Sequence, residues 1–531
     1  MSSCGSPGPY AKPGRMARIL VVGGAGYVGG AAVAHWVDRG DQVWVLDDLS
    51  TGHQVTVLGQ GLTVARAGDQ AVVGKLLKEH TFDAVAHFGA FISVGESVQN
   101  PSKYFENNVE QTRLLLETLL ENGVKRFIFS STAAVYGETG EGPIHEDLPR
   151  KPINPYGETK LQVEQLLEEL SRTRGLQAVA FRYFNAAGAE PKLRTGEWHE
   201  EETHLIPRIL DAAIGGRSVQ VYGRDYATPD GTCIRDYIHV TDLARAHAAG
   251  LDWLLEQPEG GVFQAMNLGS GHGYSVLEVI QAAEKAVGRR IEVVSHPRRT
   301  GDSARLVADA SKAKKLLGFQ PQLGLDQILE TAWAWEKKRR EPKRAVFLDR
   351  DGTLNVDPGY LNHPEKLELI PGVPEALKRL KEAGYWLVVV SNQSGVGRGL
   401  IPLEMLPRIH DRMDEILRPK GGSIDDYSLC IHHPDAGCEC RKPKPGLLLQ
   451  AAQRLGIDLN ASFMVGDKPV DVEAGRGAGV RGCVVVRTGE GKGTEAELSR
   501  SSQLKADHVA DDLLAASAWI LAQGLPASSS A

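Results

Sequence analysis

The first residues that could do chemistry are a tyrosine and a lysine four positions apart, Tyr156 and Lys160, with a threonine upstream at Thr132. Asn154 and Pro155 come just before the tyrosine and are typical of a helix start, because Asn caps the first turn and Pro fits its first position. Residues at i and i+4 share one helix face. Because an ammonium beside a phenol favours the phenolate, the pair could act as a base near neutral pH.

A second reactive group follows the apolar run Arg344–Leu348, where Asp349 and Asp351 stand two residues apart. One carboxylate could attack phosphorus while the other protonates the leaving oxygen. A hydroxyl, an ammonium and further carboxylates follow later in the chain, at Ser391, Lys442, Asp467 and Asp471. Together these types suit a site for Mg²⁺ and a phosphoryl group.

Three of the six cysteines, Cys430, Cys438 and Cys440, fall within eleven residues. His432 and His433 lie between them, and either could complete a tetrahedral set of three thiolates and one imidazole. Such a closed set binds structural zinc, whereas a disulfide framework would be sparse in a chain of this length. The alternative interpretation is that these cysteines are buried free thiols that bind no metal.

Elements that could position these residues alternate through the first half. Apolar, β-branched runs occur at Ala17–Gly23, Gln42–Leu46, Ala84–Phe88, Arg126–Ser130 and Ala178–Tyr183, and helical patterns at Gln111–Asn122 and Lys160–Thr173. This alternation predicts a parallel sheet covered on both faces. After about residue 190 the pattern loosens, which predicts a smaller substrate lobe that ends near the helix Leu325–Arg340.

A second α/β series begins after a charged segment that contains Pro342. Its expected strands are Arg344–Leu348, Trp386–Val390, Ser462–Val465 and Gly482–Val486. We therefore expect domains over residues 17–340 and 343–525, a disordered tail over residues 1–16 and a polar tail over residues 526–531.

A glycine-rich turn follows the first expected strand, with Gly23, Gly26 and Gly29 before a helix. Glycines at this spacing let the backbone approach a pyrophosphate, which then binds at the helix N-terminus. Asp47 and Asp48 end the second strand about twenty residues on, where a carboxylate accepts both ribose hydroxyls. A carboxylate there repels a 2′-phosphate, so NAD is favoured over NADP.

Composition argues against other classes of protein. The formal net charge of −7 provides no basic field for nucleic acid or an anionic membrane. No stretch approaches the roughly 18 apolar residues of a membrane span, and the Ser-, Gly- and Pro-rich N-terminus lacks the apolar core of a signal peptide. We expect a cytoplasmic enzyme with small-molecule substrates.

Over about residues 17–338 the sequence resembles the extended short-chain dehydrogenase/reductase family, and within it the UDP-glucose 4-epimerases. Five further segments carry the resemblance: Asp47–His53, Val94–Pro101, Arg182–Gly188, Val221–Val240 and Asn267–Gly271. The resemblance implies a Rossmann-type, doubly wound α/β fold with a small substrate lobe, and a homodimer. It implies NAD contacts from Gly23, Gly26, Tyr27, Val28, Gly29, Asp47, Asp48, Asp69, Phe88, Asn108 and Lys160. For the UDP moiety it implies Asn185, Arg235, Arg299 and Asp302.

The implied reaction inverts C4 of UDP-glucose or UDP-galactose. Because the hydrogen on C4 is not acidic, the sugar must be oxidised to a 4-keto form, turned and reduced from its other face. By resemblance, Tyr156 exchanges the hydroxyl proton, Thr132 binds the sugar oxygen, and Lys160 binds the nicotinamide ribose and lowers the pKa of Tyr156. Related dehydratases carry an Asp-Glu pair after this threonine, where Ala133 and Ala134 stand here. An ADP-heptose 6-epimerase or another nucleotide-sugar epimerase is the alternative.

Residues 343–525 resemble the haloacid dehalogenase superfamily, whose members share a Rossmann-like α/β domain. The resemblance makes Asp349 the nucleophile that forms an aspartyl-phosphate and Asp351 the general acid/base. Ser391, Asn392 and Lys442 would bind the phosphoryl group, and Asp349, the carbonyl of Asp351 and Asp467 would bind Mg²⁺.

A zinc loop marks the subgroup that contains heptose-bisphosphate phosphatases and histidinol-phosphatases, and its pattern selects His432 as the fourth ligand. Asn355–Tyr360 and Asn392–Gly399 resemble the enzyme that removes the 7-phosphate of D-glycero-D-manno-heptose 1,7-bisphosphate. Arg398 and Arg441 are then candidates for the second phosphate. A histidinol-phosphatase is the alternative for this domain, and a non-catalytic regulator that only binds sugar nucleotide is the alternative for the chain.

Overall fold

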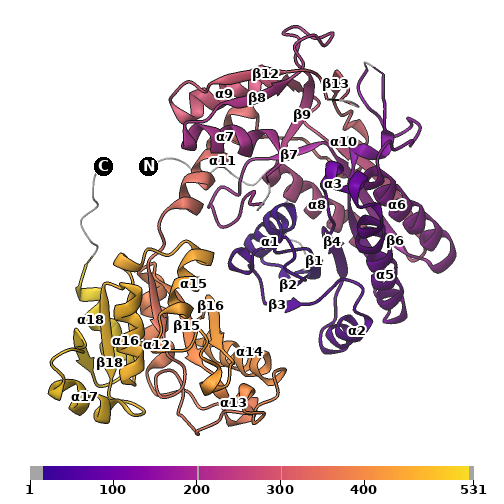
Figure 1. The fold of residues 1–531 in the computed structure, drawn as a ribbon. Helices are drawn as coiled ribbons and strands as arrows, with labels where there is room; N and C mark the ends of the chain where they lie inside the picture. The colour runs from indigo at the N-terminus through magenta and orange to yellow at the C-terminus, as the bar shows by residue number, and fades with distance from the viewer. Residues whose placement is uncertain (1–15, 141, 200–201, 300–301, 525–531) are drawn as a thin grey trace, which may run out of the picture. The chain divides into compact units, whose positions relative to one another are not determined.

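A computed structural model describes residues 16–524, apart from residues 141, 200–201 and 300–301. The chain divides into two compact units, and the boundary between them falls between Arg339 and Arg340 (Figure 1). The tails expected over residues 1–16 and 526–531 lie outside the described residues, except for Met16. Among the helices that are described, we find none with the length and apolar character to cross a bilayer.

The first unit is built on a parallel sheet of seven strands in the order β10-β6-β5-β4-β1-β2-β3. The strands are β1 (Arg18–Val22), β2 (Gln42–Asp47), β3 (Gly61–Val64), β4 (Ala84–His87), β5 (Arg126–Thr132), β6 (Gln177–Tyr183) and β10 (Val262–Leu268). The order 3-2-1-4-5-6 is that of a doubly wound Rossmann sheet, and it confirms the predicted fold class. The sequence runs of the predicted strands match these elements to within two residues at each end.

Helices cover both faces of this sheet (Figure 1). On one face α1 (Tyr27–Arg39), α8 (Val240–Leu255) and α10 (Ser311–Leu317) pack around the fully buried Trp36. On the other face the covering helices are α2 (Gln70–Glu79), α5 (Gln111–Glu121) and α6 (Pro155–Arg174). The short helices α3 (Val94–Gln99) and α4 (Pro101–Tyr104) precede α5. Both cores consist of aliphatic and aromatic side chains from alternate strand positions, as a sheet buried on both faces requires.

A smaller lobe contains the remaining elements of this unit. Its strands are β7 (Asn185–Ala187), β8 (Val219–Tyr222), β9 (Ile234–His239), β11 (Gly273–Ser275), β12 (Val293–His296) and β13 (Arg305–Leu306). Its helices are α7 (Leu205–Gly215), α9 (Val276–Val287) and α11 (Leu325–Arg340). The lobe is not one continuous segment after residue 190, because the chain returns to the main sheet for β10. Polar Gln264 and Asn267 obscured that strand in the sequence, but Asn267 is buried and bonded to Tyr136 and Ile144.

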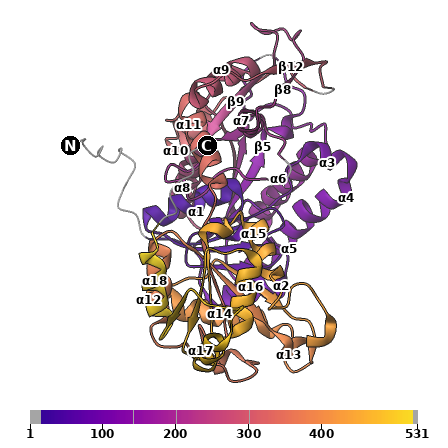
Figure 2. The same cartoon turned by 60° about the vertical axis from the view of Figure 1, so that its left-hand side comes forward.

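The second unit is a parallel sheet of six strands in the order β16-β15-β14-β17-β18-β19. The strands are β14 (Ala345–Leu348), β15 (Trp386–Asn392), β16 (Asp426–Cys430), β17 (Phe463–Gly466), β18 (Gly482–Val486) and β19 (His508–Ala510). One face is covered by α12 (Val373–Glu382), α14 (Met405–Leu417) and α18 (Leu513–Ala522). The other is covered by α15 (Gly446–Leu455), α16 (Pro469–Ala478) and α17 (Gly491–Arg500), and α15 and α16 lie side by side in Figure 2. The short helix α13 (Ser394–Gly397) follows β15, and the two edge strands were not predicted.

A buried ion pair fixes α6, the helix that carries Tyr156 and Lys160, to the first sheet. Glu164 accepts hydrogen bonds from Arg182 on β6 at 2.5 and 2.9 Å and from Ser131 on β5 at 2.6 Å. The side chains of Glu164 and Arg182 are 0% and 3% exposed. A buried pair adds little net stability, but removing one partner leaves an uncompensated charge. The register of α6 over β5 and β6 therefore depends on both partners being present.

We predict that Glu164→Ala lowers the free energy of unfolding of the first unit by about 3–5 kcal/mol. Glu164→Leu combined with Arg182→Met, which removes both charges, should recover most of that loss. Glu168→Ala is the matched control on the same helix, because Glu168 is 59% exposed and its contact with Arg150 is 3.9 Å long. Urea unfolding followed by circular dichroism measures all three. Equal midpoints for Glu164→Ala and Glu168→Ala would contradict the prediction.

Candidate active sites

The glycine-rich turn between β1 and α1 is built for close backbone approach. Gly23 has φ +81°, and a Cβ there would lie 2.3 Å from the backbone nitrogen of Gly89. A Cβ on Gly29 would lie 2.1 Å from the carbonyl oxygen of Gly23. At Gly26 the nearest atom is 3.5 Å away, so this glycine leaves open space at the N-terminus of α1. The turn therefore fits a pyrophosphate at the helix start, as the residue spacing predicts.

The two aspartates at the end of β2 have different surroundings. Asp47 is buried, and its carboxylate accepts the backbone N–H groups of Ala25 and Leu49, both at 2.9 Å. Burial raises the pKa of Asp47, while these hydrogen bonds oppose the shift. Asp48 is exposed and accepts the backbone N–H of Ser50. Asp47 thus holds the glycine turn in place, and Asp48 has the more open carboxylate for a ribose.

The other expected NAD contacts lie at the same edge of the sheet or next to it. Phe88 follows β4, and its backbone N–H bonds to Val22 at the end of β1. The Asn108 amide is buried and bonds to both backbone groups of Phe91. Asp69 caps α2 by accepting the N–H of Val72, so its side chain already has a structural role.

Tyr27 and Val28 open α1 directly after the glycine turn. The Tyr27 hydroxyl donates to the carbonyl of Gly188 at 2.6 Å, so this side chain joins α1 to the end of β7. Val28 packs on the core of that face.

The tyrosine and lysine of α6 face the end of β5. Asn154 caps the helix by accepting the N–H of Gly157 at 2.8 Å, with Pro155 at the first position, as predicted. Lys160 is buried, and its ammonium donates to the carbonyl of Ser130 at 2.7 Å and lies 4.8 Å from the centre of the Phe129 ring. Its position beside the strand end fits the expected role at the nicotinamide ribose.

The charges of this pair differ from expectation. Burial raises the pKa of Tyr156 to about 12, and the hydrogen bond with Thr132 opposes that shift. Burial also lowers the pKa of Lys160 to about 7, with the Glu164 carboxylate opposing. Lys160 therefore does not hold Tyr156 as a phenolate in the protein alone. Sequence reasoning also missed Tyr183, whose hydroxyl bonds to Ser130 beside the pair.

The residues expected at the UDP moiety lie on or beside β7, β9 and β13. Arg235 and Arg299 both approach Asp302, at 3.5 and 3.6 Å. Arg299 also stacks over the Tyr222 ring at 4.4 Å. The Asn185 amide on β7 donates to the carbonyl of Asp236 on β9, the strand that pairs with β7. The structure thus gathers two guanidinium groups, which suit phosphate oxygens.

In the second unit the acidic residues meet a buried lysine at the carboxyl edge of the sheet. The Lys442 ammonium donates to Asp349 at 2.9 Å, to Asp471 at 2.6 Å and to the carbonyl of Val390 at 2.8 Å. Burial lowers the pKa of Lys442, but the two carboxylates outweigh it and raise that pKa. Oxygens of Asp349, Asp467 and Asp471 lie within 4.8 Å of one another. Asp471, noted in the sequence beside Asp467, therefore belongs to the centre.

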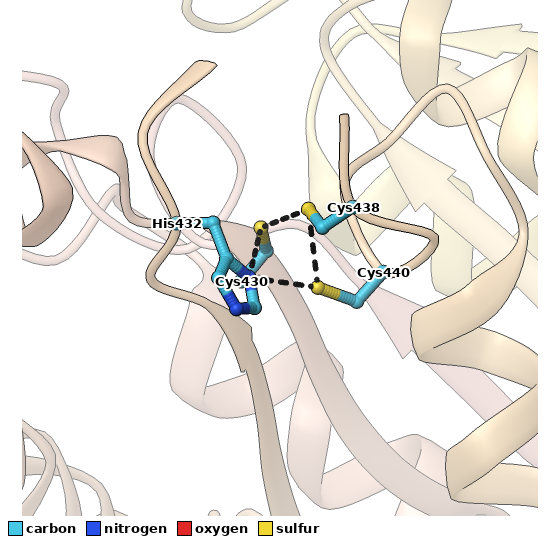
Figure 3. A group of neighbouring side chains, drawn as sticks. All are labelled: Cys430, His432, Cys438 and Cys440. Carbon is cyan, nitrogen blue, oxygen red and sulfur yellow. Dashed lines mark hydrogen bonds between the residues drawn. The ribbon is translucent and has the colours of Figure 1, made fainter. Parts of the chain in front are cut away.

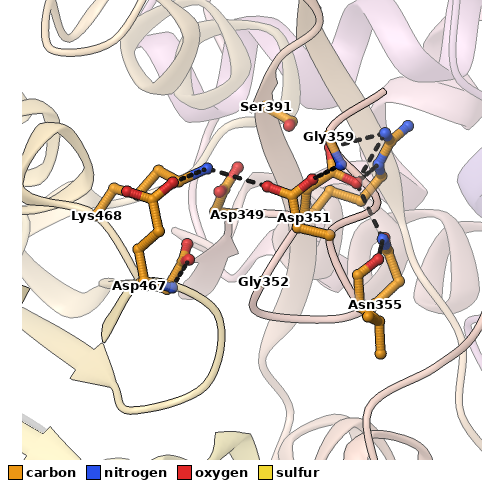
Figure 4. Close-up of polar contacts among 12 residues, drawn as sticks. Asp349, Asp351, Gly352, Asn355, Gly359, Ser391, Asp467 and Lys468 are labelled. Carbon is orange, nitrogen blue, oxygen red and sulfur yellow. Dashed lines mark hydrogen bonds and ion pairs between the residues drawn. The ribbon is translucent and has the colours of Figure 1, made fainter. Parts of the chain in front are cut away.

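The donor set of this centre fits a divalent cation. One oxygen of Asp467 accepts the N–H of Glu490, while the other is buried without a hydrogen-bond partner among the described residues. Burial and the Asp349 charge raise the pKa of Asp467 to about 7. Gly352 comes close to this carboxylate, since a Cβ there would lie 2.3 Å from Asp467 Oδ2. Figure 4 shows Asp349 and Asp467 beside the turn at Gly352.

Asp351 is held apart from that cluster. Its carboxylate accepts Arg350 at 2.7 Å, Asn355 at 2.9 Å and Gln393 at 2.8 Å, and Figure 4 shows it turned toward Asn355. These contacts outweigh burial and lower its pKa. Its side chain is not among the clustered carboxylates, so only its carbonyl could serve as the expected metal ligand. Sequence reasoning missed Arg350, Asn355 and Gln393 as partners of the acid/base candidate.

The residues expected to bind phosphate groups differ in how far they are buried. Ser391 is buried at the end of β15 and bonds to Gln393, while Asn392 exchanges two hydrogen bonds with the backbone of Lys442. Arg441 has a guanidinium nitrogen that is buried without a hydrogen-bond partner among the described residues. Arg398 is exposed.

The cysteine cluster has the shape of a tetrahedral site. Figure 3 shows the three thiols and the His432 imidazole directed at one centre. Sulfur–sulfur distances are 3.6 Å for Cys430–Cys438 and 3.5 Å for Cys438–Cys440, and His432 Nδ1 lies 3.2 Å from Cys440. A tetrahedron with Zn–S bonds of about 2.3 Å has edges of about 3.8 Å, so the spacing fits zinc. His432 and not His433 has its ring nitrogen in this group.

We predict that two glycine substitutions in the first unit separate folding from cofactor binding. Gly23→Ala should destabilise the unit, because the new Cβ would overlap the backbone of Gly89. Gly26→Ala should leave the free energy of unfolding within about 1 kcal/mol of the parent, because only one atom lies within 4 Å of the new Cβ, but should weaken NAD binding about tenfold or more. Calorimetric NAD titration and urea unfolding report the two effects, and unchanged NAD affinity in Gly26→Ala would contradict the assignment.

Comparison with known proteins gives matches in both units. Residues 19–269 match the family described as NAD dependent epimerase/dehydratase. Residues 439–516 match a family described as HAD-hydrolase-like.

The most similar curated relatives include two UDP-glucose 4-epimerases. The enzyme of Halalkalibacterium halodurans is 46% identical over 322 residues, which are 60% of this chain and 96% of the relative. That of Rhizobium meliloti is 46% identical over 324 residues, 61% of this chain and 98% of the relative. The crystal structure of UDP-glucose 4-epimerase from Brucella ovis in complex with NAD is 44% identical, covers 60% of this chain and 98% of its own, and has a TM-score of 0.58.

The family match begins within β1, and the matches to the two epimerases span nearly the full length of those relatives. The first unit also has the sheet order and glycine turn of a dinucleotide-binding enzyme. The chain therefore belongs to the NAD-dependent epimerase/dehydratase family.

Proposed function

We propose that residues 17–340 catalyse NAD-dependent C4 epimerisation of a UDP-hexose, UDP-glucose or UDP-galactose. The observation that carries the proposal is the juxtaposition of Thr132, Tyr156 and Lys160 at the carboxyl end of β5, on the edge of the sheet that also carries the glycine turn. Relatives with 46% identity along this unit bear the name UDP-glucose 4-epimerase. Cytoplasmic location and a homodimer, both expected from the sequence, remain part of this proposal.

Each side chain of this site has a separate role in the proposed reaction. Bound NAD would supply the hydride acceptor and donor. Tyr156 exchanges a proton with the 4-hydroxyl, and the Thr132 hydroxyl orients that oxygen. Lys160, fixed by the Ser130 carbonyl, binds the ribose beside it. Arg235 and Arg299 neutralise the diphosphate, so that the sugar can turn while the nucleotide stays held.

We predict that Tyr156→Phe lowers the rate of UDP-galactose conversion by about 10²–10⁴-fold, because the proton acceptor and donor is removed. Phosphate release by the second unit should not change. Asp349→Asn should show the reverse pattern, and each variant is the control for the other. Coupled detection of UDP-glucose and malachite-green detection of phosphate measure the two reactions. Conversion by Tyr156→Phe at the parent rate would contradict the mechanism, and ADP-heptose in the same assay tests the alternative substrate.

We further propose that residues 343–525 are a Mg²⁺-dependent phosphatase that acts through an aspartyl-phosphate. The supporting observation is the buried cluster of Asp349, Asp467 and Asp471 around Lys442, with one Asp467 oxygen unpartnered. Asp349 and Asp467 would hold the cation with the carbonyl of Asp351, while Lys442 and Ser391 bind phosphoryl oxygens. Attack by Asp349 on phosphorus forms the acyl phosphate as the sugar oxygen leaves with a proton from Asp351, and water then releases phosphate.

Asp351 must turn from its present contacts to reach the leaving oxygen. Arg350, Asn355 and Gln393 hold its carboxylate ionised, which is the state needed for the hydrolytic half of the reaction. These three residues are positioning residues in this proposal. Proton delivery in the first half would require the substrate to displace at least part of that set.

We propose the 7-phosphate of D-glycero-D-manno-heptose 1,7-bisphosphate as the substrate. A zinc ion on Cys430, His432, Cys438 and Cys440 would fix the loop that leads directly into Arg441 and Lys442. The loop also abuts the Arg398 segment, since a Cβ on Gly397 would lie 2.3 Å from the backbone nitrogen of His433. Both arginine candidates therefore adjoin one metal-tied loop, which favours a substrate with a second phosphate over histidinol phosphate.

We predict Mg²⁺-dependent phosphate release from the heptose bisphosphate with kcat/KM at least about tenfold above that for histidinol phosphate. Arg441→Met should reduce that preference by raising KM for the bisphosphate, whereas Arg412→Met, an exposed arginine of α14, should not. Preference for histidinol phosphate would overturn the heptose assignment and leave the phosphatase itself intact. Absence of phosphate release from either substrate in folded protein would contradict both.

A further inference from the structure

Four further side chains with metal-binding atoms converge in the loop between β7 and α7 of the first unit: Glu197, His199, Glu202 and His204. One ligand atom from each lies within 4.8 Å of the others. His199 Nδ1 is 3.1 Å from Glu202 and 3.7 Å from Glu197, and His204 Nδ1 is 3.6 Å from Glu202 and in direct contact with Glu197. No step proposed above uses any of these residues.

The two carboxylates of this cluster are withdrawn from water. The side chains of Glu197 and Glu202 are 6% and 20% exposed. Among the ion pairs of described residues, both carboxylates pair only with His199 and His204 and not with lysine or arginine. Carboxylates in such surroundings need a nearby cation to offset their lost hydration. That cation is either a protonated imidazole or a metal ion.

The backbone around the cluster is fixed from two sides before any ligand binds. Trp335 on α11 donates its indole N–H to the carbonyl of Glu197 at 2.9 Å, and Gly196 lies against the same ring. On the other side Trp198 stacks on His53 with ring centres 3.7 Å apart and planes 15° apart. Fixed backbone on both sides favours pre-organised ligands over a mobile group of surface charges.

We propose that Glu197, His199, Glu202 and His204 form a binding site for a divalent transition-metal ion. Two imidazoles and two carboxylates are a donor set that suits Zn²⁺ or Mn²⁺ and lacks the thiolates of the cysteine cluster. The site is distinct from the proposed Mg²⁺ and zinc centres, all of whose residues belong to the second unit.

The bound ion would be structural, because it ties the substrate lobe to the dinucleotide fold. His204 is the N-cap residue of α7 of the lobe. Tyr27 is the first residue of α1. Burial and the nearby Glu197 and Glu202 carboxylates raise its pKa. Trp198 reaches His53 in the loop after β2. One ion on this loop would therefore stabilise the contacts among the start of α7, the start of α1 and the loop after β2, which border the expected NAD site.

The competing arrangement is an ion-pair network without metal. Burial lowers the pKa of His204, but the Glu197 and Glu202 carboxylates outweigh it and raise that pKa to about 9. In that case a charged His204 imidazole pairs with the two carboxylates and no metal is retained. Direct metal analysis separates the two arrangements.

The test uses the full chain with Cys438→Ser, Cys440→Ser and Asp467→Asn, which remove two thiolates from the cysteine cluster and one carboxylate from the proposed Mg²⁺ centre. After dialysis against a chelator, the protein is reloaded with Zn²⁺ or Co²⁺, desalted and analysed by mass spectrometry for metal. We expect one equivalent per chain, a rise in the thermal midpoint of the first unit, and cobalt absorption without a sulfur-to-cobalt charge-transfer band. His199→Gln with His204→Gln should abolish all three effects, and Glu202→Gln should weaken metal binding about tenfold or more.

His145→Gln is the matched control, because His145 is 49% exposed and its nearest carboxylate, on Asp147, is 3.9 Å away. It should retain the metal. If the cysteine substitutions impair folding, the Asp467→Asn chain with Co²⁺ serves instead, and the proposal then requires two equivalents, of which the histidine variant loses one. Equal metal content in the histidine variant and the control, or none in either, would overturn the proposal in favour of the ion-pair network.

Discussion

Each unit buries a lysine ammonium at the carboxyl edge of a parallel sheet, where a strand carbonyl accepts one of its protons. Lys160 donates to Ser130 on β5 and Lys442 donates to Val390 on β15. An ammonium withdrawn from water is tolerated only where fixed polar groups replace its hydration. The ends of neighbouring parallel strands supply such groups, because their last carbonyls and side chains meet at one edge. The reactive residues around each lysine therefore occupy positions dictated by strand order.

The two lysines differ in what else surrounds them, and this difference sets what each site lacks. Asp349 and Asp471 contact Lys442 and keep it charged, but with Asp467 the centre has more carboxylates than cations. That excess is what a divalent cation would balance. Lys160 has no carboxylate in contact with its ammonium among the described residues, and burial lowers its pKa to about 7. A hydroxyl-bearing ligand would complete the surroundings of Lys160, whereas a divalent cation would offset the excess of carboxylates around Lys442.

The fold and the reacting residues could be read from sequence where spacing reflects local geometry. The cap at Asn154, the i and i+4 pair on α6 and the glycine turn each follow from local rules, and the structure shows the expected conformations. Strand β10 and the partners of Asp351 could not be predicted, since they depend on burial and on contacts between distant segments. The cluster at Glu197 had a sequence signal, alternating Glu and His over eight residues, but its convergence is a property of the folded loop.

The pKa of Tyr156 bears on how the first site must operate. Burial raises that pKa, so in the protein alone the Tyr156 phenol stays protonated at neutral pH and is a poor base. Thr132 already contributes its hydrogen bond, and Lys160 is committed to the Ser130 carbonyl. Positive charge on a bound molecule would stabilise the phenolate further. Oxidised NAD carries such a charge on its nicotinamide ring. An enzyme that releases this cofactor between turnovers would lose its base each time, which favours a cofactor that stays bound through the catalytic cycle.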